Sequence, residues 1–410
     1  MSEMTTGSLA TPAPSPRWNP FVRLNATWRV PLMAWLLSRL VVIGVAVIGS
    51  VWLGWTPEST PSRVPRSLTL LGGWDTHWYL RIATHGYQTS TAGISTHHSD
   101  FVFYPLLPAV MHIGLLTSSS PFLWGLVASN VAFLLGLVAF RALTEDRSGA
   151  RLADLSTWVL AFSPAAVYAS LAYTDGILLG LATGAAVTAW RGKWWAATLL
   201  AAVSVLARPQ GFLVAVLVAM IAVTAPAVPG RVRAGRAALA VVPAVLVYVG
   251  FLAWMQFARG SWQLPFIGQR AWYRTSPGVP ALKGIGSELQ YVFTYPWSRA
   301  HLADYRVLYW TGPVRDLIMT LAMVALVWAL IRVEGSWRSI WVIFTVLALL
   351  VPLASGNFSS DMRFGLLAFP LVWPVARWLE RGSLRRVSMT AGAGGLVIVL
   401  LVLQLRYAYP

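Results

Sequence analysis

The chain has 410 residues, of which 57% are hydrophobic and only 11% charged, so we expect one polytopic membrane domain and not an ordinary soluble fold. Its net charge of +17 would suit nucleic acid, but the arginines form short clusters between apolar runs, so we interpret them as topology signals and expect no nucleic-acid partner. The absence of cysteine excludes disulfides, thiolate nucleophiles and cysteine metal sites.

The amino-terminal part is polar and rich in Ser, Thr and Pro, which predicts a disordered cytoplasmic tail over residues 1–27. Residues 28–410 are predicted to form a single transmembrane domain. The first apolar run, over 30–55, is too long for a signal peptide and long enough for a bilayer of about 30 Å. We therefore interpret it as a retained helix.

Hydropathy predicts an all-α bundle of about eleven spans. The later runs lie at 121–140, 155–171, 176–190, 194–207, 211–225, 237–257, 316–331, 339–354, 364–379 and 389–405. With a cytoplasmic amino terminus, the short basic loops fall inside, as the positive-inside rule requires. Two long segments, 56–120 and 258–315, then lie outside, and the first should contain short interfacial helices. The arginine-rich, lysine-poor and alanine-rich composition indicates a bacterial plasma-membrane protein.

The first outer segment contains the most informative motif, a carboxylate beside aromatic residues, in the run GGWDTHWYLRIATHGY over 72–87. The two glycines permit a sharp turn, a helix is predicted from Trp74 to His85, and Gly86 is suited to end it. At helical spacing Asp75, Trp78, Tyr79 and Ile82 share one face. Asp75 is therefore a candidate catalytic acid or, alternatively, an ordinary first-turn carboxylate favoured by the helix dipole.

The same segment also contains His77, His97, His98 and Asp100. A divalent metal site is conceivable, but no HExxH or similar spacing is present, so neither a metal nor another cofactor is favoured. Asp100 is interpreted first as the N-cap of the segment 101–108, with a supporting role in the site as the alternative.

Further polar groups follow at the outer ends of later spans. The segment FSPAAVY over 162–168 and then Tyr173, Thr174 and Asp175 suit a polyol substrate, or else form a Pro-kinked helix whose Thr174-Asp175 caps the next one. Arg208, in LARPQG, is predicted at a helix break and could bind a phosphate or extend to the interface.

Arg363, in SSDMRF, has the same two interpretations as Arg208, with Asp361 as a possible local partner. Most of the 22 tryptophans are expected to be interfacial anchors, although Trp74, Trp78 or Trp272 could stack on a sugar ring.

The motifs in chain order are WDTHWYLRIATHGY, DFVFYPLLP, FSPAAVYASLAYTDG, LARPQG and SSDMRFGLLAFP. Together, over about residues 35 to 375, they resemble the PIG-V-like mannosyltransferases of the GT-C glycosyltransferase superfamily. The resemblance implies a GT-C-like bundle that transfers mannose from a polyprenyl-phosphate donor at the extracytoplasmic face, with Asp75 as the essential acid and Arg208 and Arg363 on the donor phosphate. The other residues expected to bind substrate are Trp74, His77, Trp78, Tyr79, Asp100, Tyr104, Tyr173, Thr174 and Asp175.

This chain departs from the family pattern at Thr174-Asp175, and its acceptor-side loops are not recognisable. The acceptor is therefore open among glycolipid, glycan and protein. A β-linked donor giving an α-linked product requires inversion, for which Asp75 would be the general base. The alternatives are another polyprenyl-phosphate sugar, a lipid or solute transporter, or a non-catalytic scaffold.

Overall fold

The computed structural model describes residues 20–54, 56, 64–225, 228–272, 274, 277–298, 314–356 and 361–382, together with residues 388, 391, 392, 394, 395 and 398. Within this part of the chain every regular element is a helix, which confirms the all-α fold class.

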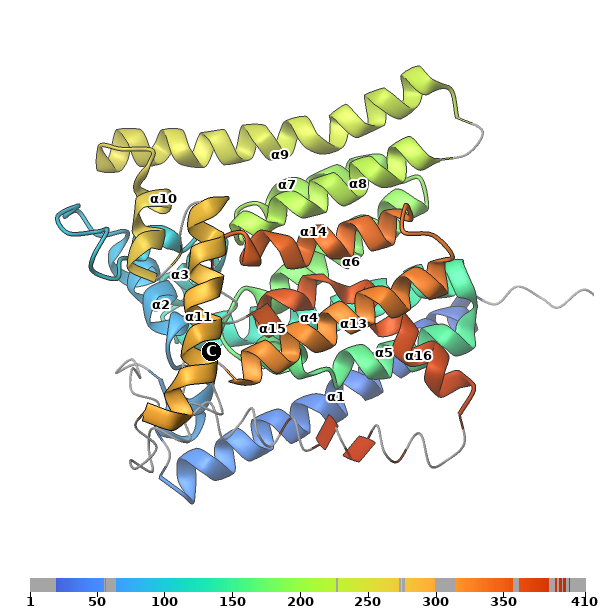
Figure 1. The fold of residues 1–410 in the computed structure, drawn as a ribbon, viewed down its shortest axis with the longest axis horizontal. Coiled ribbons are helices and arrows are strands. Elements are labelled where there is room, and N and C mark those ends of the chain that lie inside the picture. Colours follow the sequence, from blue (N-terminus) through green and yellow to red (C-terminus); the bar gives the residue numbers. More distant parts are fainter. Residues whose placement is uncertain are drawn as a thin grey trace, which may run out of the picture.

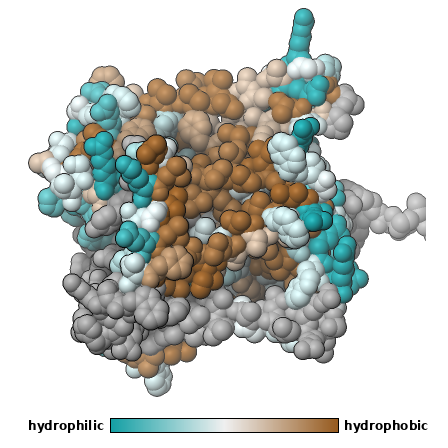
Figure 2. Space-filling model, viewed as in Figure 1, coloured by the Kyte–Doolittle hydropathy of each residue, from teal (hydrophilic) through white to brown (hydrophobic). Residues whose placement is uncertain are grey.

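Four helices are long and apolar enough to cross a membrane. They are α1 (Pro20–Val51), α4 (Pro121–Ser148), α9 (Gly230–Arg259) and α13 (Arg315–Glu334). At 1.5 Å per residue each matches a hydrocarbon layer of about 30 Å. They run along the same direction in Figure 1, and Figure 2 shows a broad hydrophobic surface between hydrophilic atoms at the two ends. The protein is therefore a membrane protein.

Shorter helices fill the space between these four. Residues 155–171 do not form one straight span, because α5 (Ala150–Ala161) bends by 67° into the 3-10 helix η3 (Pro164–Ser170). The other short apolar helices are α6 (Asp175–Trp190), α7 (Trp194–Ser204), α8 (Phe212–Thr224) and α14 (Ile340–Leu353). By length and composition the described residues thus contain four helices long enough to cross a membrane, or five with the bent pair, so the predicted count of about eleven spans is not confirmed.

The predicted span over 364–379 is broken into α15 (Asp361–Phe364), η7 (Gly365–Leu367), η8 (Phe369–Leu371) and α16 (Val372–Glu380). Pro370 has no backbone N–H to donate, which interrupts a continuous helix. At the amino terminus α1 begins at Pro20, so residues 20–27, which were predicted to belong to the tail, are helical. Residues 1–19 and most of the predicted span 389–405 lie outside the described residues.

The described parts of the two long segments predicted outside lie at one end of the bundle, on the left in Figure 1. We call this the loop end. As predicted, the first segment contains short helices, and the second crosses the bundle with α11. The helices of the loop end are η1 (Arg66–Leu71), α2 (Asp75–His85), η2 (Asp100–Val102), α3 (Leu106–Leu116), α10 (Leu264–Gly268), η5 (Gln269–Trp272) and α11 (Val279–Ser298).

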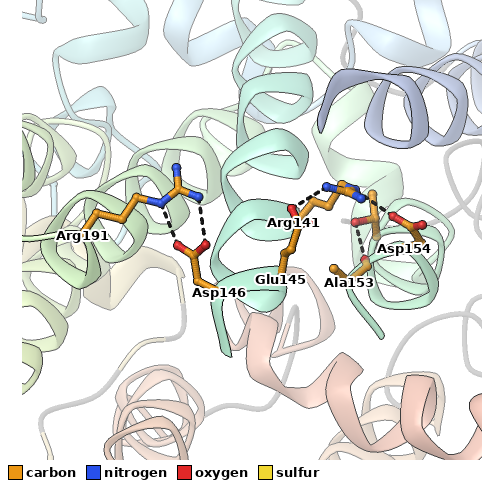
Figure 3. A network of polar contacts seen from close by, with 7 residues as sticks. Arg141, Glu145, Asp146, Ala153, Asp154 and Arg191 are labelled. Atoms are coloured by element: carbon orange, nitrogen blue, oxygen red, sulfur yellow. Dashed lines mark hydrogen bonds and ion pairs between the residues drawn. The ribbon is translucent and has the colours of Figure 1, made fainter. Parts of the chain in front are cut away.

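The opposite end, which we call the basic end, contains arginines of the short loops that were predicted to be cytoplasmic, among them Arg141, Arg147 and Arg191. Figure 3 shows Arg191 paired with Asp146 at 2.7 Å, and Arg141 between two carboxylates. Arg147 at the end of α4 binds Glu334 at the end of α13 at 3.0 Å. These pairs connect the helix ends at the basic end.

Arg39 is a buried charge within α1. Its Nη1 donates to the carbonyl of Ala166 at 3.1 Å, and its guanidinium lies 4.5 Å from the centre of the Phe133 ring. Ala166 belongs to η3, where the bend leaves backbone carbonyls without helical partners. Arg39 therefore stabilises the α5–η3 bend, which gives this charge a structural role.

Helices α4 and α6 approach closely at Gly180, where a Cβ would lie 2.5 Å from the carbonyl oxygen of Ala132. We expect Gly180→Ala to force these helices apart and to destabilise the protein by about 1–3 kcal/mol. The matched control is Gly235→Ala, because a Cβ at Gly235 meets nothing within 4 Å. Thermal unfolding in detergent should show a lower Tm for Gly180→Ala only, and equal Tm values would contradict this packing.

Candidate active site

Asp75 is placed by the turn that precedes α2. Trp74 has a φ of 48°, which is rare for a residue with a side chain, and the helix begins at the next residue. The helix ends at His85, followed by Gly86 with a φ of 75°. The predicted helix and its glycine stop are therefore confirmed, with the start displaced by one residue.

Asp75 belongs to a continuous chain of ion pairs, which we call the Asp75–Arg208 network. Its Oδ2 forms an ion pair with Nη1 of Arg363 at 2.6 Å, and Nε of Arg363 donates to Oδ2 of Asp175 at 3.0 Å. Nη1 of Arg208 donates to the other oxygen of Asp175 at 2.6 Å. Four residues far apart in the sequence thus alternate in charge, on α2, α6, α15 and the α7–η4 break.

The network is largely removed from water. Side-chain exposure is 4% for Arg363 and 1% for Asp175, but 15% for Asp75. Burial alone would lower the pKa of Arg363, yet the carboxylates of Asp175 and Asp75 raise it well above the ordinary value. Asp75 is therefore the more accessible carboxylate of the network, and among the described residues its Oδ1 has no hydrogen-bond partner.

Aromatic and hydroxyl groups surround the network. The Arg363 guanidinium lies 4.3 Å from the centre of the Tyr173 ring, and the Tyr79 hydroxyl is 3.3 Å from that of Thr174. Burial raises the pKa of Tyr79 to about 12, partly offset by the charge of Arg208. Tyr79 therefore stays protonated at neutral pH and acts as a hydrogen-bonding group.

The structure decides between the alternatives at Thr174-Asp175. The Pro-kinked arrangement is confirmed, because α5 ends before Pro164 and α6 begins at Asp175. Thr174 occupies the N-cap position of α6, but its side chain makes no hydrogen bond to the helix, so the predicted side-chain cap is wrong. The Asp175 carboxylate instead binds two arginines.

Arg208 and Arg363 lie in backbone breaks. Arg208 precedes η4 (Pro209–Gly211) in extended conformation, as predicted. The described partners of Arg363 are Asp75 and Asp175, whereas the side chain of Asp361 lies outside the described residues. A small cavity of about 10 Å³ lies between Asp175, Arg208 and Arg363, which is room for a water molecule.

Asp100 is outside the network, and its predicted role as an N-cap is wrong. Ser99 is the N-cap of η2, and the buried Asp100 carboxylate instead accepts from the backbone N–H of Gln88 at 2.9 Å. It also lies 3.7 Å from Arg81. Burial raises the pKa of Asp100, against the effects of this hydrogen bond and of Arg81. Its position indicates that it holds the first outer segment together.

The remaining candidates form an aromatic cluster beside the network. Trp78 stacks on Phe103 at 5.8 Å and meets Trp272 edge-on at 6.0 Å, so protein rings already contact Trp78. Trp272 also stacks on His98 at 4.2 Å. His77 is largely exposed, but partial burial of its ring, together with the charge of Arg81, lowers its pKa. Trp74 is buried at the start of α2.

Tyr104 packs against Phe251, a lining residue of an apolar groove, with 5.0 Å between the ring centres, and its hydroxyl donates to that of Tyr248 at 3.3 Å. The groove has a volume of about 690 Å³ and runs between α2, α3 and α9, within the size range of ligand sites. Its lining residues are Ile82, Ala83, Gly86, Tyr87, Pro105, Pro108, Ala109, His112, Leu206, Val247, Phe251, Trp254 and Arg259. Leu206 is two residues from Arg208, so the groove and the network share this segment.

Three groups of the site were not selected from the sequence. Arg274 lies 5.3 Å from the centre of the Phe364 ring, whose centre is also 4.7 Å from Arg208. Arg315 and Asp316 pair at the start of α13, and the Tyr168 hydroxyl is buried in η3. In the sequence, Arg315 is distinguished by its position at the end of the outer segment 258–315, directly before the apolar run 316–331. In the described part of the chain, no three His, Asp or Glu side chains are grouped as metal ligands.

A scan of protein-family models and a search of curated proteins find no match. Among solved structures, the chain is similar to the oligosaccharyltransferase AglB from Archaeoglobus fulgidus in complex with an inhibitory peptide and a dolichol-phosphate. The identity is 13% and the TM-score 0.47, over 92% of this chain and 56% of AglB. It is also similar to ArnT from Cupriavidus metallidurans bound to undecaprenyl phosphate, with 14% identity and a TM-score of 0.43, over 95% of this chain and 78% of ArnT.

The chain thus spans little more than half of the length of AglB. Because both TM-scores lie below 0.5, the site is interpreted from its own residues.

Removal of Asp175 leaves Arg208 and Arg363 without the carboxylate they share. Because an unpaired buried charge is costly, we expect Asp175→Ala to destabilise the protein by about 3–5 kcal/mol. Asp146→Ala removes a more exposed pair at the basic end, with side chains 46% and 30% exposed, and should cost less than about 1 kcal/mol. Thermal unfolding of both variants in detergent checks the difference, and a Tm for Asp175→Ala as high as that for Asp146→Ala would disprove it.

Proposed function

We propose that the protein is a membrane glycosyltransferase of the GT-C type that uses a polyprenyl-phosphate-linked sugar. The observation that carries this proposal is the Asp75–Arg208 network at the loop end of an apolar bundle, in which the more accessible carboxylate, Asp75, pairs with the buried Arg363, and Asp175 connects Arg363 to the partly buried Arg208. A base for a hydroxyl and cations for a phosphate are what such a transfer requires.

Asp75 is the proposed general base. The acceptor hydroxyl oxygen attacks the anomeric carbon, the bond from that carbon to the phosphate oxygen breaks, and the hydroxyl proton passes to the Asp75 carboxylate. The Oδ1 atom, which has no partner among the described residues, is the available acceptor of that proton. Attack opposite the leaving group inverts the anomeric configuration.

Arg208 and Arg363 are the proposed stabilisers of the leaving group. The phosphodiester of the donor leaves as a polyprenyl phosphate monoester, so it needs positive charge more than a proton. Both guanidinium groups are fixed by Asp175, which keeps them oriented before substrate binds. Since Arg363 also holds Asp75, a phosphate that binds Arg363 competes with the Asp75 carboxylate and makes that carboxylate more available as a base.

The groove between α2, α3 and α9 is proposed to hold the isoprenoid chain of the donor. Its wall is apolar apart from a few groups such as Arg259 and His112, which suits a hydrocarbon chain near an anionic head. Leu206 in this wall and Arg208 in the network are two residues apart, which places chain and phosphate close together.

Mannose is the proposed sugar, because of the order of motifs from WDTHWY to SSDMRF, and the acceptor is a glycolipid, glycan or protein. The reaction is placed at the extracytoplasmic face of the plasma membrane, since the basic end fits the cytoplasmic side. A transporter is the weaker alternative, because the described charges lie mainly at the two ends and Arg39 serves the α5–η3 bend.

Asp75→Asn keeps the shape of the side chain but removes the base, so we expect a loss of transfer of at least about 100-fold. The assay is transfer from radiolabelled polyprenyl-phosphate mannose to a membrane extract, with and without chelator. Asp100→Asn is the control, because Asp100 is an acid of the same segment outside the network, and it should retain activity if it folds. Near-normal turnover by a folded Asp75→Asn protein would exclude this mechanism.

Ala109 lines the groove and is exposed, so Ala109→Trp fills the groove without entering the core. We expect KM for a long-chain donor to rise at least about tenfold, with little change for a donor that carries a short isoprenoid. Leu116→Trp on the same helix is the control, because Leu116 is 74% exposed and is not a lining residue. A rise in the acceptor KM instead would assign the groove to the acceptor.

A further inference from the structure

We infer that Arg315 and Tyr168 belong to the phosphate site of this protein, together with the third nitrogen of Arg363. This inference rests on the proposed function and extends it to two residues on other elements. It starts from three buried donor atoms that have no hydrogen-bond partner among the described residues: Nη2 of Arg363, Nη1 of Arg315 and the hydroxyl of Tyr168. Buried donors are normally satisfied, because leaving one without a partner costs free energy.

The three donors come from elements that meet. Helix α15, which contains Arg363, packs against both α13 with Arg315 and η3 with Tyr168. The Tyr168 hydroxyl is within electrostatic range of Arg315 and Arg363. Nε and Nη2 of Arg39 are also buried without partners, but their guanidinium lies over the Phe133 ring within the bundle.

The remaining nitrogens of both arginines are already occupied. Nη1 and Nε of Arg363 bind Asp75 and Asp175, and Nε and Nη2 of Arg315 bind the carboxylate of Asp316. Each guanidinium is therefore fixed by carboxylates on one side and offers one unused nitrogen. Fixed N–H groups from two arginines with a phenol hydroxyl match the several acceptor oxygens of a phosphate better than a single carboxylate.

The charge around these donors also favours an anion. Among the described side chains the cluster has four guanidinium groups, on Arg208, Arg274, Arg315 and Arg363, and three carboxylates, on Asp75, Asp175 and Asp316. Because the cavity beside Arg363 is only about 10 Å³, a phosphate can enter only when other side chains that line it, such as Gln210 and Phe364, move aside, while the carboxylates keep the guanidinium groups in place. The ligand class is a phosphate monoester or diester, either as a lipid headgroup or as free phosphate.

The test is the binding affinity of undecaprenyl phosphate for the full chain in nanodiscs. Tyr168→Phe removes only the hydroxyl and should weaken binding about threefold to tenfold, and Arg315→Gln should weaken it more than about tenfold. Thr157→Val is the control for loss of a buried hydroxyl, because Thr157 lies in α5 and donates to the carbonyl of Ala153, and Arg191→Gln is the control for loss of one positive charge at the basic end. Both controls should bind like the unchanged protein.

Two further probes separate the sources of the phosphate. Undecaprenol has no phosphate, so its binding should not respond to Tyr168→Phe or Arg315→Gln. If inorganic phosphate displaces undecaprenyl phosphate from the unchanged protein but not from Arg315→Gln, the phosphate group alone is recognised. If it displaces the lipid from neither protein, the phosphate must be part of a lipid headgroup. Both results support the assignment.

Normal undecaprenyl phosphate affinity in folded Tyr168→Phe and Arg315→Gln proteins would overturn the inference, while the loss of transfer in Asp75→Asn could still stand. Weaker undecaprenol binding in the same variants would also overturn it. If the unchanged protein bound no polyprenyl phosphate and transferred no sugar, the proposed function itself would fail.

Discussion

The arrangement of side chains at the loop end depends on the two ion pairs of the Arg363 guanidinium group. This group binds Asp75 from α2 and Asp175 from α6, and Asp175 in turn binds Arg208. A buried charge is tolerated only where partners satisfy it, so these contacts require the three segments to come together in one geometry. The same contacts that stabilise these buried charges also place the Asp175 carboxylate between Arg208 and Arg363.

Breaks in the helices make this arrangement possible. A continuous helix satisfies its own backbone and turns its side chains outward, whereas a break allows a polar side chain to enter the bundle from its end. Asp175 follows the bend between α5 and η3, Arg208 precedes Pro209, and Arg363 lies in the four-residue helix α15. The short helices α6, α7 and α8 are therefore part of what positions the site.

The two ends of the bundle use arginine differently. At the basic end Arg191 and Asp146 form a partly exposed pair that connects helix ends and is screened by water. At the loop end the pairs are buried, and their electrostatic effects are stronger because less water screens them. Within the described residues, it is the loop end that combines strong fields with an accessible carboxylate and an adjacent apolar groove.

The sequence by itself determined the membrane class, the all-α fold, the helix that begins at Asp75, its glycine stop and the break at Arg208, because each depends on local composition or on residues a few positions apart. Tertiary structure alone decided that the elements of Arg315 and Tyr168 pack against the helix of Arg363, and that Asp100 lies outside the network. A pairing between residues more than a hundred positions apart depends on how the helices pack, and no local pattern records it. The length of each apolar helix was likewise set by tertiary structure: apolar runs buried among other helices can be short, since their neighbours and not the lipid cover them.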